Sequence, residues 1–194
     1  MALDFLTSEA VRSCVSMEAC IDLMAATMIS VSHGEASIPQ RNVVALGSSG
    51  NAFVDMPGAI ASPGTFGTKI VSFFPGNREL PAIQGLIVVF DCSTGQPKAV
   101  VDAAAVTALR TAAASGMATR WLARENSETL ALLGYGVQAE YHLRAMQAVR
   151  PIKRAIVWGR SEDKAEAFAK RNRSLAGIDI IIAPDARTAV EQSD

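Results

Sequence analysis

The sequence is poor in charged residues, histidine and cysteine for a chain of 194 residues. Charged residues make up 19%, whereas hydrophobic residues make up 49%. Soluble domains usually carry roughly 25% charged residues. A chain of this length and composition buries a sizeable core, which excludes an intrinsically disordered protein. The low charge also favours a buried subunit interface.

A strong excess of either charge is also absent, since the formal net charge is −1. Proteins that bind nucleic acid or anionic membranes usually carry an excess of Lys and Arg, so we expect neither partner. The first ten residues, MALDFLTSEA, lack the basic start of a secretory signal. The longest Ala-rich stretch is interrupted by Asp102 and Arg110, so no membrane span is expected. These features favour a cytoplasmic protein.

The three cysteines, Cys14, Cys20 and Cys92, are odd in number and form no Cys-x-x-Cys pair. This pattern indicates neither a disulfide framework nor a cysteine zinc site, so we expect no metal. We interpret all three as small hydrophobic residues of the core.

The first two thirds of the chain predict helices around a set of strands. Apolar residues at helical spacing predict helix in the first 32 residues, with Thr7, Ser8 or Ser16 as N-caps. Segments rich in β-branched and aromatic residues predict strands at 41–46, 51–55, 66–74, 86–91 and 97–101. The loop 92–96 favours antiparallel pairing of the last two strands. Asp102 is expected to cap an Ala-rich helix over 103–123.

From Thr129 onward, strands alternate with helices. We expect strands at 130–133, 155–158 and 178–182 and helices at 138–149, 162–175 and 187–192. This alternation implies right-handed parallel crossovers. The sequence therefore predicts an α/β protein with an α+β domain at 1–124 and a βαβαβ domain at 125–194.

The segment TLALLGYGVQAEYHL contains Gly134-x-Gly136-x-x-Ala139 between an expected strand and an expected helix. Gly134 permits a tight turn, Gly136 lets the backbone approach a pyrophosphate, and Ala139 allows close packing of helix on strand. The helix N-terminus then faces the phosphates. This context predicts dinucleotide binding by a Rossmann-type domain, and an empty structural turn is the alternative.

The end of the second strand of this domain distinguishes NAD from NADP. NAD-binding proteins place an acidic residue there against the ribose hydroxyl. Here the chain has Gly159, Arg160 and Ser161, which suit a 2′-phosphate. We therefore favour NADP, with NAD possible. The alternative is that Arg160 is a solvated residue among other basic side chains.

Three basic residues have apolar neighbours in the sequence, namely Arg41, Lys69 and Arg110. Thr107, Arg110 and Thr111 share one face of the expected Ala-rich helix. A small carboxylate substrate beside a dinucleotide phosphate would satisfy the three cations. From the residues alone, it is equally consistent that each of the three is an ordinary exposed or ion-paired side chain.

Several stretches together carry a family resemblance from about Pro39 to the last residue. They are MPG at 56–58, GTKIVSFFPG, the pair Gln84-Gly85, STGQPKAVVDAAAVTALRTAAASGMATRWLA and LLGYGVQAEYHLRAM. In these stretches the sequence resembles the ornithine cyclodeaminase/mu-crystallin family. The pair Arg160-Ser161 is similar to the NADP-using, mu-crystallin branch.

The resemblance implies specific roles. Domain 1–124 would bind substrate and form a homodimer, and 125–194 would be the first half of a Rossmann domain. Arg41 and Lys69 would bind the substrate carboxylate, and Arg110 would contact both substrate and cofactor. The other residues that the resemblance or the Gly motif assigns to the cofactor are Thr111, Gly134, Gly136, Val137, Gln138, Ala139, Gly159, Arg160 and Ser161.

The implied reaction is hydride transfer between a nicotinamide and the α-carbon of an amino or cyclic imino acid. Ornithine-acting members carry an acidic residue where this chain has Val54, and strand alternation directs Asp55 to the opposite face. This favours a ketimine or Δ1-pyrroline-2-carboxylate reductase over an ornithine cyclodeaminase that makes proline and ammonia. A non-catalytic, crystallin-like dinucleotide-binding protein and an interaction fragment also stay open.

Family members are longer, and their acid/base Asp follows the third strand of the nucleotide sheet. No residue of this chain matches that Asp, so the catalytic acid is expected after residue 194. The chain is therefore expected to be a fragment of a longer protein, or a natural short form that is inactive as a dehydrogenase.

Overall fold

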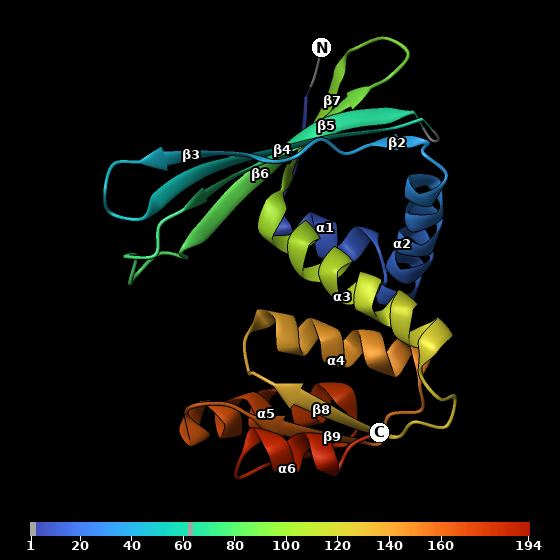
Figure 1. Ribbon diagram of the computed structural model, residues 1–194, viewed down its shortest axis with the longest axis vertical. Coiled ribbons are helices and arrows are strands. Elements are labelled where there is room, and N and C mark those ends of the chain that lie inside the picture. The colour runs from blue at the N-terminus through green and yellow to red at the C-terminus, as the bar shows by residue number, and fades with distance from the viewer. Residues whose placement is uncertain (1–2, 62–63) are drawn as a thin grey trace. The chain divides into compact units, whose positions relative to one another are not determined.

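The computed structural model describes residues 3–61 and 64–194, with the side chains of residues 174–176 excepted. The chain forms two compact units (Figure 1). The first unit comprises residues 1–16 and 26–107, and the second comprises 17–25 and 108–194. The domain boundary after residue 124 stays a prediction.

The first unit is built on a mixed sheet in the order β1-β7-β6-β5-β4-β2, with β3 also paired to β4. All pairs are antiparallel except β1 with β7, so the expected hairpin of β6 and β7 is confirmed. The strands are β1 (Asp4–Leu6), β2 (Ala36–Ser37), β3 (Asn42–Leu46), β4 (Asn51–Ile60), β5 (Thr65–Phe73), β6 (Ile83–Asp91) and β7 (Pro97–Asp102).

Three helices are connected to these strands. The helices α1 (Ser8–Cys14) and α2 (Met17–Ser32) lie between β1 and β2 in the chain, and α3 (Ala103–Leu122) follows β7. The expectation of helix throughout the first 32 residues is wrong at Asp4–Leu6, because this segment pairs with β7. Thr7 caps α1 by accepting a hydrogen bond from the Ala10 N–H at 3.3 Å. Asp102 caps α3 as expected, because its Oδ1 accepts from the Ala105 N–H at 2.7 Å.

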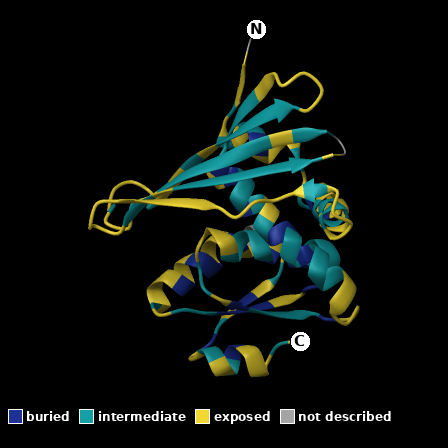
Figure 2. Cartoon of the chain, turned by 45° about the horizontal axis from the view of Figure 1, so that its top comes forward, coloured by how far each residue is buried: buried dark blue, intermediate teal, exposed yellow. Residues whose placement is uncertain are grey.

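The strand register defines the two faces of the sheet. Met56, Lys69 and Ile87 lie opposite one another and share what we call the pocket face. Asp55 belongs to the other face, here called the open face, where its carboxylate accepts a hydrogen bond from Thr68 Oγ1. Exposed hydrophobic side chains lie on both faces: Val44, Leu46, Phe53, Phe66 and Leu86 on the open face, and Val43, Phe73 and Ile83 on the pocket face. Buried residues are concentrated on the helices and in the second unit (Figure 2).

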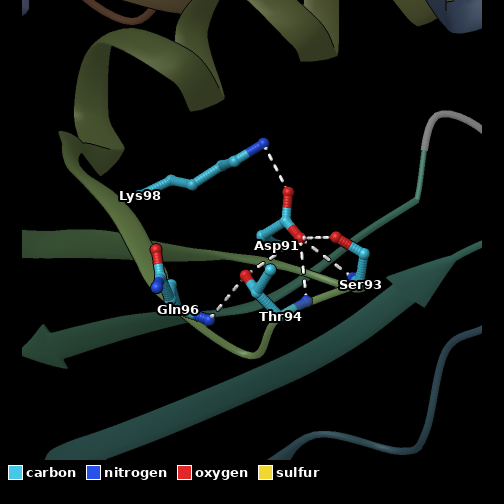
Figure 3. A network of polar contacts seen from close by, with 5 residues as sticks. All are labelled: Asp91, Ser93, Thr94, Gln96 and Lys98. Carbon is cyan, nitrogen blue, oxygen red and sulfur yellow. Dashed lines mark hydrogen bonds and ion pairs between the residues drawn. The ribbon is translucent and has the colours of Figure 1, made fainter.

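The turn between β6 and β7 is closed by one carboxylate (Figure 3). Asp91 Oδ1 accepts from the backbone N–H groups of Ser93 and Thr94 at 2.9 and 3.0 Å, and from both hydroxyls. Its Oδ2 pairs with Lys98 Nζ at 2.8 Å. The hydrogen bond from Lys98, followed by that from the Ser93 hydroxyl, holds the pKa of Asp91 well below its usual range. The ionised carboxylate therefore organises the loop between the two strands.

The second unit contains a parallel sheet in the order β10-β9-β8, as the alternation of strands and helices predicts. Its elements are β8 (Thr129–Leu133), α4 (Val137–Val149), β9 (Arg154–Trp158), α5 (Glu162–Ala176), β10 (Asp179–Ile182) and α6 (Ala186–Glu191). The core joins Leu132, Val157 and Ile180 of the strands to Leu143 of α4 and Phe168 of α5. Helices thus cover the strands whose carboxyl ends carry the candidate nucleotide site.

Two contacts fix α3 within the second unit. Gly116 permits a close approach, because a Cβ there would lie 2.9 Å from Ile21 Cδ1 and 3.3 Å from Ala145 Cβ. The C-terminus of α3 is held by Arg150, which is 9% exposed. The guanidinium donates to the carbonyls of Thr119, Arg120, Ala123, Arg124 and Val149 at 2.6 to 3.0 Å. Arg150 therefore bonds carbonyls at and just after the end of α3, where a helix leaves such groups without intrahelical partners.

The interpretation of all three cysteines as core residues is wrong for two of them. Cys20 is buried on α2, whereas Cys14 ends α1 and Cys92 lies in the loop after β6, where both are exposed. Burial raises the pKa of the Cys20 thiol. No single helix in residues 3–61 and 64–194 is long and apolar enough to span a membrane; α1 and α2 meet those criteria only together, as a pair bent by 85°.

Candidate functional site

The glycine turn lies between β8 and α4, at the carboxyl end of the first parallel strand. Gly134 has φ +139°, a conformation that favours glycine. Its N–H donates to the Trp158 carbonyl at 2.8 Å, which ties the turn to the end of β9. The turn and the end of β9 are thereby held next to each other.

Gly136 is the N-cap of α4 and provides no side chain to bond the first N–H groups of the helix. A Cβ at Gly134 or Gly136 would meet no atom within 4 Å, so the space in front of the turn is open. Free N–H groups and the helix dipole favour an anion at such a place. Ala139 packs against the core beneath the helix, while Val137 and Gln138 are exposed. These residues fit the pyrophosphate of a dinucleotide.

Gly159, at the end of β9, has a structural role that sequence reasoning missed. A Cβ at this position would lie 2.1 Å from Tyr135 Cε1, so the Tyr135 ring occupies the space beside the glycine. A cavity of about 360 Å³ lies at the same edge of the sheet. Its lining residues are Trp158, Gly159, Glu162, Ile182, Ala183 and Pro184. The ends of β9 and β10 thus border a space next to the glycine turn.

Arg160 and Ser161 differ in the freedom of their side chains. Arg160 is exposed and has no side-chain partner among the described residues, so its guanidinium is available to an anion. Ser161 is the N-cap of α5, where its hydroxyl oxygen accepts from the Lys164 N–H at 3.4 Å. The Ser161 hydroxyl keeps its proton for donation to a second group.

Lys69 lies in the middle of β5 on the pocket face, and its Nζ donates to Thr107 Oγ1 at 3.5 Å. It lines a largely apolar cavity of about 460 Å³. The other lining side chains of the pocket face include Met56, Ile60, Ile87 and Val89, and α2 adds Thr27 and Val31. An apolar cavity with one ammonium group suits a small molecule that has a hydrocarbon body and a carboxylate.

The other two basic residues expected to bind substrate are not among the residues that line this cavity. Arg41 is exposed in the segment between β2 and β3 and does not line the Lys69 cavity. Arg110 is exposed on the part of α3 that belongs to the second unit. Next to it, Thr111 Oγ1 is buried and has no hydrogen-bond partner in the described chain. A buried hydroxyl without a partner is energetically costly, so Thr111 can still accept or donate one bond.

A pair of polar side chains that sequence reasoning did not consider links α3 to α4. Ser115 Oγ lies 3.0 Å from His142 Nε2, and His142 Nδ1 lies 2.7 Å from the Gln138 carbonyl oxygen. Gln138 and His142 are four residues apart on one helix, so their contact could have been predicted from the sequence. Nothing local in the sequence indicates the contact between Ser115 and His142. The pair is therefore a finding of the structure.

Comparison with known proteins gives one consistent result. The model of the ornithine cyclodeaminase/mu-crystallin family matches residues 1–194. The Δ1-pyrroline-2-carboxylate reductase of Bacillus cereus is 32% identical over 185 residues, which cover 94% of this chain and 57% of that protein. The chain thus spans a little over half of the length of this relative.

Two solved structures share the fold. The Δ1-pyrroline-2-carboxylate reductase of Thermococcus litoralis, in complex with NADH and L-proline, has a TM-score of 0.92 at 31% identity. The match covers 98% of this chain and 60% of that one. An archaeal alanine dehydrogenase dimer with bound NAD has a TM-score of 0.87 at 31% identity, over 95% and 57% of the two chains.

Proposed function

The chain belongs to the ornithine cyclodeaminase/mu-crystallin family, and on this basis we propose that it acts as an NAD(P)-dependent reductase of a cyclic imino acid. The substrate class is a ketimine such as Δ1-pyrroline-2-carboxylate. The observation that carries the proposal is the open glycine turn, where the uncapped N-terminus of α4 meets the end of β9. The similar B. cereus and T. litoralis proteins, which are named for this reaction, support it.

The reaction adds a hydride to the α-carbon of the C=N bond and a proton to the nitrogen, which gives the cyclic amino acid. The bound dinucleotide supplies the hydride. The first N–H groups of α4 would hold its pyrophosphate, with Gly134, Gly136, Val137, Gln138 and Ala139 forming the turn. No residue of this chain is assigned the proton transfer, which needs a group within hydrogen-bond reach of the nitrogen.

Lys69 would hold the substrate carboxylate within the apolar cavity of the pocket face. We propose Arg41 and Arg110 as further substrate contacts, and Arg110 with Thr111 as contacts to the cofactor. Val54 leaves the cavity side of β4 without a carboxylate, since Asp55 bonds Thr68 on the open face. A free side-chain amine would have no acidic partner there, which favours imine reduction over ornithine cyclisation.

The proposal includes a homodimer formed through the open face. Val44, Phe53 and Leu86 expose 51%, 38% and 43% of their surfaces there, an arrangement typical of an interface. The similar archaeal protein is described as a dimer. We assign this surface to a substrate-binding and dimerisation domain at 1–124, with a partial Rossmann domain at 125–194. Light scattering on the purified chain measures the mass in solution and thereby tests the homodimer.

The deciding experiment follows the loss of NADPH absorbance in the presence of Δ1-pyrroline-2-carboxylate. Turnover that the Lys69→Met variant loses supports the reductase. Nucleotide binding without turnover would favour a non-catalytic dinucleotide-binding protein. Failure to bind either nucleotide would favour the remaining alternative, an interaction fragment.

A preference for NADP is the finer part of the proposal, since the two similar structures hold NADH and NAD. It depends on Arg160, whose guanidinium is exposed and unpaired in the described chain beside Gly159. We expect Arg160→Ala to weaken NADPH binding about tenfold or more, because a charged hydrogen bond contributes about 1.5–3 kcal/mol. NADH binding, measured by fluorescence titration, should change less than about twofold, which is below 0.5 kcal/mol.

The matched control is Arg171→Ala, which removes the same charge from an exposed position of α5. It should leave both affinities unchanged. An equal loss of NADH and NADPH affinity in Arg160→Ala would contradict a 2′-phosphate contact.

A further inference from the structure

The contact between Ser115 and His142 joins the two helices that carry the proposed nucleotide-binding residues. Ser115 lies on α3, one turn after Thr111, and His142 lies on α4, one turn after Gln138. The His142 ring bridges them, with Nε2 at 3.0 Å from Ser115 Oγ and Nδ1 at 2.7 Å from the Gln138 carbonyl. Both side chains are half-buried.

The hydrogen-bond chemistry fixes the protons of this bridge. A carbonyl oxygen can only accept, so His142 Nδ1 carries the proton and donates to Gln138. In a neutral imidazole the other nitrogen then accepts, so the Ser115 hydroxyl donates to Nε2. The Ser115 hydroxyl has one proton, so it bonds Nε2 at 3.0 Å in preference to the Thr111 carbonyl at 3.4 Å, one turn back along α3. Each polar atom of the ring therefore has one defined partner.

The bridge lies beside a close approach of α3 and α4. Gly116, next to Ser115, allows the approach, since a side chain there would meet Ala145 of α4. Packing alone would leave the rotation and sliding of the two helices to apolar contacts. The bridge adds directional bonds, and they act on the first turn of α4, whose N–H groups face the open space of the glycine turn.

We propose that His142 is a positioning residue for the dinucleotide: through Ser115 it fixes the first turn of α4 relative to the turn of α3 that carries Thr111. The inference rests on the proposed function, because it assigns His142 to the same nucleotide site. His142 does not need to touch the ligand. It holds the N–H groups of α4 in place before binding, which reduces the cost of ordering them when the pyrophosphate arrives.

The test measures the dissociation constants for NADPH and NADH alongside the melting temperature. We expect His142→Ala, which removes two hydrogen bonds, to weaken the binding of both nucleotides about tenfold. Ser115→Ala removes one hydrogen bond and should weaken the binding of both about fivefold. The double variant should bind as weakly as His142→Ala alone, because both changes break one bridge. His142→Gln, which keeps an acceptor for the Ser115 hydroxyl, should recover most of the affinity.

The control is the exposed His33, which follows α2, so His33→Ala should leave both constants unchanged. In 15N spectra of the wild type, the His142 ring should show a protonated Nδ1 and an unprotonated Nε2. Ser115→Ala removes only one half-buried hydroxyl and keeps the test open if the His142 variants do not fold.

Three results would overturn the proposal. If the wild type binds nucleotide and the folded variants bind it within twofold, the inference fails while the proposed function stands. If the variants lose only thermal stability, the bridge merely supports the fold. If the wild type binds neither nucleotide, the inference and the proposed function fail together.

Discussion

Replacement of Gly136 by valine is expected to weaken the binding of both NADPH and NADH by more than about 100-fold, equivalent to about 2.7 kcal/mol. The melting temperature should change little. The backbone of Gly136 has φ −85° and ψ −175°, which a β-branched residue also adopts. No atom lies within 4 Å of the new Cβ, so the folded chain accommodates the side chain. The same open space is where the pyrophosphate would approach the backbone. Nucleotide titration and thermal unfolding of the same samples test the two expectations.

The matched control is Gly76→Val, because Gly76 also has open space around its Cβ position and no left-handed backbone. It should leave both affinities unchanged. Gly134→Val is less informative, since φ +139° makes any side chain strained there and would lower stability as well. Nucleotide affinity within threefold of wild type in Gly136→Val would show that the phosphates bind elsewhere.

Local sequence patterns were sufficient to predict the strands and helices of residues 129–191, although not that residues 17–25 belong to the same unit. Each strand of the parallel sheet is a short apolar run, and two of the three helices that follow these strands begin after a side chain that caps them, Ser161 for α5 and Asp185 for α6. The glycine turn was predictable for the same reason, because Gly134, Gly136 and Ala139 lie within six residues of one another. Structure that depends on neighbours in the sequence is visible in the sequence.

The first unit shows where local patterns fail. β4 continues to Ile60 through Pro57, although a proline lacks the N–H of a central strand. The register explains this: β3 pairs with residues 51–55 of β4 and β2 with Ala59 and Ile60, so Pro57 faces neither strand. Similarly, Asp4–Leu6 forms a strand only because β7 lies beside it. Both outcomes depend on partners that are distant in the sequence.

The candidate site divides in the same way. The residues of the turn and of the end of β9 could be predicted, whereas the contact of Tyr135 with Gly159 and the bridge of His142 to Ser115 could not. Each of these joins positions more than twenty residues apart. For Gly159 the spatial neighbour changes the reason for the residue, because the Tyr135 ring itself excludes a side chain there.

Arg150→Met is expected to lower the free energy of unfolding by about 3 kcal/mol, because it breaks a buried hydrogen-bond network and a hydrogen bond from a charged group contributes about 1.5–3 kcal/mol. The sequence places Arg150 in a basic neighbourhood, but the structure buries it against the end of α3. Its guanidinium donates to five carbonyls, and methionine fills a similar volume with no donor. Those carbonyls would then be left without their charged partner. Urea unfolding followed by circular dichroism measures the loss.

Two further variants separate the bonds of Arg150 from its charge. Arg154→Met removes an exposed guanidinium that pairs only loosely with Asp179, at 3.6 Å, and should cost less than about 1 kcal/mol. Arg150→Lys keeps the positive charge at the helix C-terminus but has fewer donors and no planar fork, so it should recover only part of the stability. If Arg150→Met unfolds at the same urea concentration as Arg154→Met, the carbonyls of α3 are satisfied by water, and Arg150 does not hold the end of the helix.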